Sequence, residues 1–146
     1  MAWLIYMIIV WTVALIFVPL KHWKKSWPVG ITAMVIVFIL DNTLEHLNAF
    51  KFWYGGIYLS GLPLYYWLCY FPGGIIFDYL RPYKHIWRLT YILIVAFVYL
   101  LIELVMIYSG YFQYIKWTAA MSYLLNIVGF TISMWYAEWF EELRNK

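Results

Sequence analysis

Five apolar segments, each close to the length that crosses a lipid bilayer, are the feature that most constrains the fold of this 146-residue chain. A transmembrane helix needs about 20 predominantly apolar residues, because the hydrocarbon core of a bilayer is about 30 Å thick. The segments cover residues 2–20, 28–47, 60–80, 89–109 and 117–137. We therefore predict an all-α integral membrane protein, a five-helix transmembrane bundle that forms one domain over residues 1–146.

Composition excludes an ordinary water-soluble domain. Hydrophobic residues make up 66% of the chain and charged residues only 12%, and a domain of this length cannot hide that much apolar surface from water. The N-terminal segment lacks the basic start and the small-residue cleavage site of a signal peptide, so we expect it to remain as the first span. No sequence motif points to a cofactor, a metal or nucleic acid, so none of the three is expected.

Lysine and arginine residues predict the orientation. All but Lys51 and Lys116 fall in the segments after the first and third spans and in the C-terminal tail. Because cytoplasmic segments are enriched in these residues, we predict that the N-terminus lies outside and the C-terminus in the cytoplasm. His22 and His85 lie in the basic segments and are expected to be solvated.

The third apolar segment is interrupted by Pro72-Gly73-Gly74. Proline removes a helical hydrogen bond and glycine disfavours helix, so we predict a kink at these residues. A discontinuous helix of the transporter type is the alternative interpretation. In the same segment, Cys69 is expected to pack in the interior, and Asp78 and Arg81, three residues apart, are expected to form an ion pair.

Acidic residues interrupt the second half of the second span. Asp41 and Glu45 are one helical turn apart and share a face, and His46 lies beside them. A carboxylate in hydrocarbon costs roughly 3 kcal/mol on insertion scales, so such a group usually faces the interior of a bundle. The second span therefore predicts an internal acidic site.

Polar residues of three other spans lie at a similar predicted depth, in the outer half of the bilayer, when positions are counted at about 1.5 Å per residue. We predict that they join the second span in a buried acidic and aromatic pocket. Its candidate residues are Asp41, Glu45, His46, Tyr65, Tyr66, Glu103 and Asn126. No catalytic role is assigned. The alternative is a hydrogen-bonded polar plug that sets the register of the helices.

The loop between the second and third spans is aromatic rather than charged. Aromatic side chains of this kind anchor helices at the membrane interface, and we predict that location. A lid over the acidic pocket is the alternative. The residues concerned are Phe50, Phe52, Trp53, Tyr54 and Tyr58.

Two resemblances extend these predictions. The second half, from Glu103 through residues 114–118 to Trp135-Tyr136-Ala137-Glu138-Trp139-Phe140, is similar to a family of small multi-span bacterial integral membrane proteins without an assigned activity. This resemblance implies a multi-pass protein of the bacterial cytoplasmic membrane.

The region from Asp41 to Leu80 resembles the small-subunit, heterodimeric type of bacterial lycopene cyclase. It has an acid in the second span, an aromatic loop and then Gly61-Leu62-Pro63-Leu64. In those enzymes two glutamates follow the Pro-Leu pair and act as acids on the polyene, whereas Tyr65 and Tyr66 follow it here. Under this resemblance Asp41 and Glu103 would supply the proton.

These observations lead to one functional prediction and two alternatives. We predict a pocket that binds a proton, a cation or a polar lipid headgroup, in a protein that works as an accessory or oligomeric unit. The alternatives are a membrane-embedded enzyme that modifies an isoprenoid or lipid by acid catalysis, and a small transporter that acts as an oligomer. The expected partners are membrane lipids and either a second copy or another membrane protein.

Overall fold

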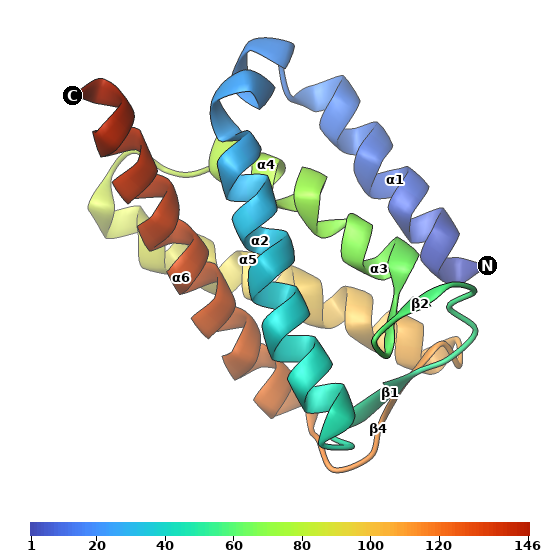
Figure 1. Cartoon of the computed structure of the whole chain (residues 1–146). Helices are drawn as coiled ribbons and strands as arrows, with labels where there is room; N and C mark the ends of the chain where they lie inside the picture. The colour runs from blue at the N-terminus through green and yellow to red at the C-terminus, as the bar shows by residue number, and fades with distance from the viewer.

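The computed structural model describes residues 1–146 and is mostly helical (Figure 1). The third predicted span is divided between two helices, and each of the other four corresponds to one helix. The helices are α1 (Ala2–Phe17), α2 (Leu20–His46), α3 (Leu64–Leu68), α4 (Tyr70–Tyr79), α5 (His85–Tyr108) and α6 (Ala119–Asn145).

The chain is mostly helical, as predicted, but the connecting segments form short strands that the prediction did not include. Strand β1 (Phe50–Phe52) pairs antiparallel with β4 (Phe112–Tyr114), so the segment after α2 is joined to the segment after α5. Strands β2 (Tyr58–Leu59) and β3 (Leu62–Pro63) form a hairpin. Its turn, Ser60 and Gly61, has φ values of 53° and 102°, and type I′ hairpin turns require positive φ at both central positions.

Helix α2 begins at Leu20, well before the predicted start at Pro28, and Pro28 lies inside it. A proline within a helix leaves unpaired the carbonyl four residues earlier. Here that carbonyl belongs to Lys24, which is an exposed residue in the polar first turns. Because water can hydrate this carbonyl, the helix tolerates Pro28 and includes the basic segment before it.

The interruption of the third span lies at Cys69, between α3 and α4, and Pro72-Gly73-Gly74 lie within α4. The predicted position of the kink is therefore wrong by about one turn. The ring of a proline clashes with the carbonyl four residues before it, which for Pro72 is that of Leu68, the last residue of α3. The proline thus causes a break one turn N-terminal to itself. Cys69 is buried, which confirms its predicted packing role.

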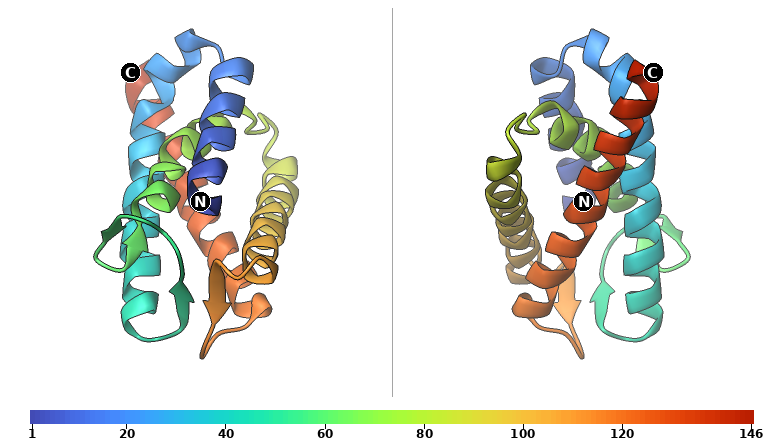
Figure 2. Two further views of the ribbon diagram at one scale, coloured as in Figure 1. Left: turned by 90° about the vertical axis from the view of Figure 1, so that its right-hand side faces the viewer. Right: turned by 90° about the vertical axis from the view of Figure 1, so that its left-hand side faces the viewer.

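The helices pack in an order that differs from their order in the chain. Helix α4 packs against α2, α2 against α6, and α6 against α5. Helix α1 packs on α3 and α4. Helices α1 and α5 are the two flanks of this arrangement, and both face the viewer in the left view of Figure 2.

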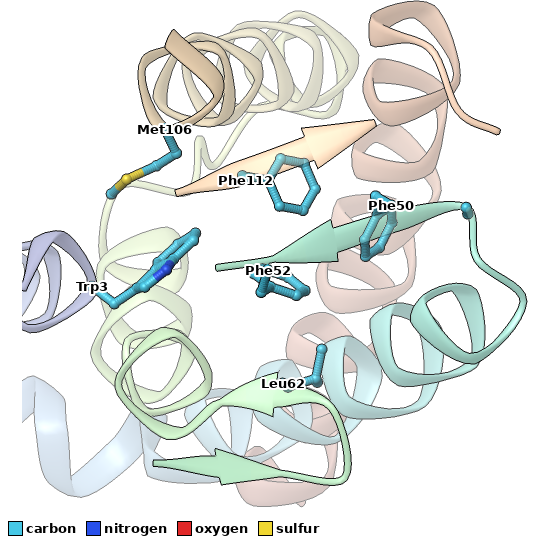
Figure 3. Packing of buried hydrophobic residues seen from close by; sticks show 7 residues of the cluster. Trp3, Phe50, Phe52, Leu62, Met106 and Phe112 are labelled. Atoms are coloured by element: carbon cyan, nitrogen blue, oxygen red, sulfur yellow. The ribbon is translucent and has the colours of Figure 1, made fainter. Parts of the chain in front are cut away.

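A cluster of buried apolar side chains closes the end of the molecule near the N-terminus (Figure 3). It surrounds the β1–β4 pair, and the indole Nε1 of Trp3 ties α1 to it by donating a hydrogen bond to the carbonyl of Trp53 (3.1 Å). The labelled members are Trp3, Phe50, Phe52, Leu62, Met106 and Phe112. We call this end the aromatic end.

At the opposite end α1 joins α2, α4 joins α5, and α6 terminates near Lys25 (Figure 1). We call it the basic end, because every lysine and arginine except Lys51 and Lys116 belongs to these junctions or to the C-terminal turn. The ion pair between Asp78 and Arg81 is found here, as predicted, with 3.2 Å between Oδ1 and Nε.

Large apolar side chains cover the outer faces of the helices. Only 27 of 146 residues are buried, and exposed residues such as Ile8 on α1, Phe97 on α5 and Leu124 on α6 face away from the molecule. Two helices, Leu20–His46 and His85–Tyr108, are long and apolar enough to cross a membrane by length and composition.

Thr118 caps α6, and its side chain provides a first test of the fold. The Thr118 hydroxyl accepts a hydrogen bond from the backbone amide of Met121 (3.3 Å). We expect Thr118→Ala to lower the free energy of unfolding by about 1 kcal/mol, because an amide of the first turn loses its acceptor. Unfolding of the detergent-solubilised protein, followed by circular dichroism, measures this change.

Thr131→Ala is the matched control in the same helix. The Thr131 hydroxyl donates to the carbonyl of Ile127 (2.7 Å), a carbonyl that the helix already pairs, so its removal should leave stability nearly unchanged. Equal losses in the two variants would contradict a capping role for Thr118.

Candidate functional site

A small cavity of about 50 Å³ lies beneath the β1–β4 pair and is lined by side chains from all of the longer helices. Eleven of its fifteen lining residues are hydrophobic, and several of these are aromatic. The remaining four are Asp41, Glu103, Ser122 and Asn126. We call it the acidic cavity.

Asp41 of α2 is held by tyrosines of the third span. The hydroxyl of Tyr66 in α3 donates a hydrogen bond to Oδ2 of Asp41 (2.5 Å), and its oxygen lies 2.7 Å from the hydroxyl oxygen of Tyr70 in α4. The break at Cys69 lies between these two tyrosines. The three groups form a hydrogen-bonded row that fixes one Asp41 oxygen and leaves the other without a partner in the protein.

Glu103 of α5 is held in a similar way from α6. The hydroxyl of Ser122 donates to Oε1 of Glu103 (2.6 Å) and accepts a hydrogen bond from Nε1 of Trp117 (2.8 Å). Tyr114 lies beside this pair in β4, and burial raises the pKa of its phenol. Each carboxylate of the cavity therefore has its own hydroxyl donor.

The predicted burial of the carboxylates is wrong. Asp41, Glu45 and Glu103 are half-buried, and the only buried polar side chains are serines 26, 122 and 133. A carboxylate without a cationic partner is expensive to remove from water. The fold avoids this penalty because it leaves accessible space next to each acid.

Three predicted residues lie outside the acidic cavity. Glu45 faces the β2–β3 hairpin, where a Cβ at Gly61 would lie 2.5 Å from its Oε2. His46 lies near the same turn, with 3.4 Å between its Nε2 and Oγ of Ser60. Tyr65 lines a separate pocket next to Met1. The hairpin covers the last turn of α2, and neighbouring residues of a helix point about 100° apart, so Tyr66 enters the cavity and Tyr65 does not.

The aromatic loop is divided between two environments. Phe50 and Phe52 are buried and line the acidic cavity, so their predicted location at the membrane interface is wrong. Trp53, Tyr54 and Tyr58 are exposed. Phe50 and Phe52 point to the same face of β1 because successive side chains of a strand alternate, and Lys51 between them is exposed. Trp53, Tyr54 and Tyr58 lie beyond this strand. The sequence interpretation missed this strand because its partner, β4, is distant in the chain.

An apolar groove adjoins the acidic cavity between the two flanking helices α1 and α5. Its volume is about 410 Å³, and nine of its ten lining residues are hydrophobic. Tyr6, Ile102 and Met106 line both the groove and the cavity. These three side chains form the shared wall between the apolar groove and the cavity that holds the two carboxylates.

No lysine, arginine or histidine lines the acidic cavity. Two carboxylates therefore face one space without a protein counter-charge, which favours either a bound cation or a proton on one of them. No group of three or more histidine, cysteine or acidic residues is arranged to hold a metal ion.

Sequence reasoning also missed a second polar centre, at the basic end. His22 was expected to be solvated, but its Nε2 lies 3.3 Å from Oδ2 of Asp78, and the buried hydroxyl of Ser26 donates to the same carboxylate. His22 and Ser26 are one turn apart on α2 and therefore share a face. This spacing could have predicted the centre only if the helix had been expected to begin before Pro28.

Comparisons with protein-family models, with curated proteins and with solved structures found no match to this chain.

Proposed function

We propose that this chain is an integral membrane protein of five spans that binds a lipid carrying a primary ammonium group. The apolar side chains on the outer faces of α1, α5 and α6 support the membrane location, since contiguous apolar surface of this extent is unusual on soluble monomers. The collection of cationic residues at the basic end supports a cytoplasmic C-terminus and an outer location for the aromatic end.

The acidic cavity suits an ammonium group by charge and by hydrogen bonding. An ammonium has three donors and no acceptor, and Asp41, Glu103 and Asn126 together offer acceptors from three helices. Aromatic faces attract cations, and Trp3 and Tyr70 are among the rings in the cavity wall. The single positive charge of the ammonium would also balance one of the two carboxylates, which have no counter-charge in the protein.

The shared wall is the observation that carries the proposal. A lipid needs an apolar channel for its chain and a polar site for its head, and here the two adjoin at Tyr6, Ile102 and Met106. The groove volume lies within the range of about 300–1,000 Å³ that is usual for ligand sites. The chain of the lipid would lie between α1 and α5, and its amine would pass the shared wall into the cavity.

The size of the cavity predicts selectivity among amines. A cavity of about 50 Å³ has room for a few water-sized groups, since a single water needs about 10–15 Å³ by the same measure. A primary ammonium fits this space, whereas a trimethylammonium group is too large. The site should therefore distinguish phosphatidylethanolamine from phosphatidylcholine.

Native mass spectrometry of the protein in micelles that contain equal amounts of the two lipids tests this proposal. We expect the wild-type protein to retain phosphatidylethanolamine preferentially. Asp41→Asn should weaken retention about tenfold, because a charged hydrogen bond to the ammonium is replaced by a neutral one. The matched control is Glu45→Gln, one turn away on α2 and outside the cavity, which should retain the lipid as the wild-type protein does.

Equal retention of the two lipids, or equal losses in Asp41→Asn and Glu45→Gln, would contradict the proposal. A second candidate function, acid catalysis on an isoprenoid, is favoured by the same adjacency, because Glu103 lies next to Ile102 of the apolar groove and beside a hydroxyl donor. In that case an isoprenoid, and not the amine lipid, would be extracted from the purified protein. The Glu103→Gln variant would carry this isoprenoid in unmodified form.

A further inference from the structure

A second, larger pocket of about 240 Å³ lies at the basic end, among α2, α4, α5, α6 and the segment that joins α4 to α5. It is distant from the acidic cavity and shares no lining residue with it. Four cationic side chains and two carboxylates line it, together with His22. These charged residues are Lys25, Asp78, Arg81, Arg88, Glu141 and Arg144.

Both carboxylates of the pocket take part in ion pairs within it. Arg81 contacts both of them, with 3.2 Å from Nε to Oδ1 of Asp78 and 2.5 Å from Nη2 to Oε2 of Glu141. Arg88 pairs with Glu138 of α6. Because Arg81 bridges the two acids of the pocket and Arg88 pairs with Glu138, Lys25 and Arg144 have no carboxylate partner.

Lys25 and Arg144 form no ion pair. The guanidinium of Arg144 is positioned against α2 by a hydrogen bond from Nη1 to the backbone carbonyl of Lys25 (3.4 Å), and both residues line the pocket. The Nε of Arg88 is buried without a hydrogen-bond partner. The pocket therefore combines an excess of positive charge with one buried donor, Nε of Arg88, that has no acceptor in the protein.

We propose that this pocket binds the phosphate group of an anionic phospholipid in the cytoplasmic leaflet. Guanidinium groups match the geometry of phosphate oxygens, and basic pockets between membrane helices on the cytoplasmic side bind anionic headgroups. Tyr79 and Tyr83 line the pocket and are exposed, as aromatic side chains at headgroup level usually are. This site shares only the membrane orientation with the proposed function and does not depend on the acidic cavity.

Native mass spectrometry of the full chain in micelles of equal phosphatidylglycerol and phosphatidylcholine tests the site. We expect the wild-type protein to retain one phosphatidylglycerol preferentially. The double variant Lys25→Gln, Arg144→Gln should retain it about thirtyfold more weakly, because each of the two cations contributes a similar part of the binding free energy. The matched control, Lys24→Gln, Lys146→Gln, removes two cations of the same end that do not line the pocket, and should retain the lipid as the wild-type protein does. Lys25 and Arg144 are exposed, so folding should be unaffected.

Equal loss in the two double variants, or equal retention of the two lipids, would overturn the proposal. Inorganic phosphate, added alone as a third arm, is expected not to raise the thermal stability of the protein. If it does so and displaces phosphatidylglycerol, the site binds free phosphate and the lipid assignment is wrong. Asp41→Asn should leave phosphatidylglycerol retention unchanged, so the failure of the proposed function can be told from the failure of this inference.

Discussion

Replacement of Asp78 by alanine is expected to lower the free energy of unfolding by about 3 kcal/mol. The Asp78 side chain is only 10% exposed and joins α4 to α2 and to the segment after α4. It accepts a hydrogen bond from the buried hydroxyl of Ser26 and pairs with Arg81, which is 13% exposed. Without the carboxylate, the nearly buried Arg81 keeps only the more exposed Glu141, and the buried Ser26 hydroxyl keeps only Nε2 of His22. Removal of one member of a buried pair is strongly destabilising. Denaturant unfolding of the detergent-solubilised protein measures the loss.

Glu141→Ala is the matched control, because it removes the other carboxylate that Arg81 contacts. The Glu141 side chain is 42% exposed, and exposed ion pairs contribute only about 0–1 kcal/mol. We expect a loss below about 1 kcal/mol, with the Asp78 pair intact. A Glu141 variant that is as unstable as the Asp78 variant would show that burial does not set the strength of this network.

Gly74→Ala is expected to destabilise the protein by about 3 kcal/mol, at the upper end of the range for overpacking. Gly74 of α4 lies directly against α2, and a Cβ there would lie 2.9 Å from the Cα of Gly30 and from the Cβ of Ala33, and 3.0 Å from the carbonyl oxygen of Val29. Backbone atoms cannot rotate away as a long side chain can, so α2 and α4 would have to separate. This is the most extensive helix contact in the molecule, and small residues at a contact let two helices approach closely.

Gly129→Ala provides the matched control for the same substitution. Gly129 also lies inside a helix, α6, but the nearest atom to a Cβ there is Cγ2 of Ile36, at 4.0 Å. Alanine should fit without displacement, and stability should rise by up to about 1 kcal/mol because alanine favours helix. Thermal unfolding of both variants in one detergent separates the two outcomes. A Gly74 variant as stable as the wild-type protein would mean that α2 and α4 can move apart freely.

The apolar segments predicted most of the helices because their signal is local. Runs of about 20 apolar residues correspond to α1, α2, α5 and α6, and the spacing of Asp78 and Arg81 predicted their ion pair. The start of α2 and the break before Pro72 were misplaced. Both errors concern the carbonyl four residues before a proline. Before Pro28 this carbonyl is accessible to water and the helix continues, whereas before Pro72 it clashes with the proline ring and the helix breaks. Amino-acid composition does not distinguish these two cases.

The sequence predicted correctly those site residues whose position depends only on their depth along a helix. Asp41, Tyr66, Glu103 and Asn126 meet in one cavity, and their predicted levels in the bilayer were similar. Glu45 lies near Gly61, and Tyr65 lines another pocket, because the path of the hairpin after α2 decides which face of the helix end is covered. Whether the cavity binds an amine lipid stays a prediction.

The sequence by itself determined that this chain is mostly helical, where most of its helices lie, and that its cations collect at one end, because length, apolarity and charge count are properties of neighbouring residues. The tertiary structure alone decided that β1 meets β4 over the acidic cavity, that α1 and α5 leave an apolar groove between them, and that His22 and Ser26 reach Asp78. These features join residues far apart in the chain. Their positions follow from how whole helices pack, for which no short stretch of sequence carries the information.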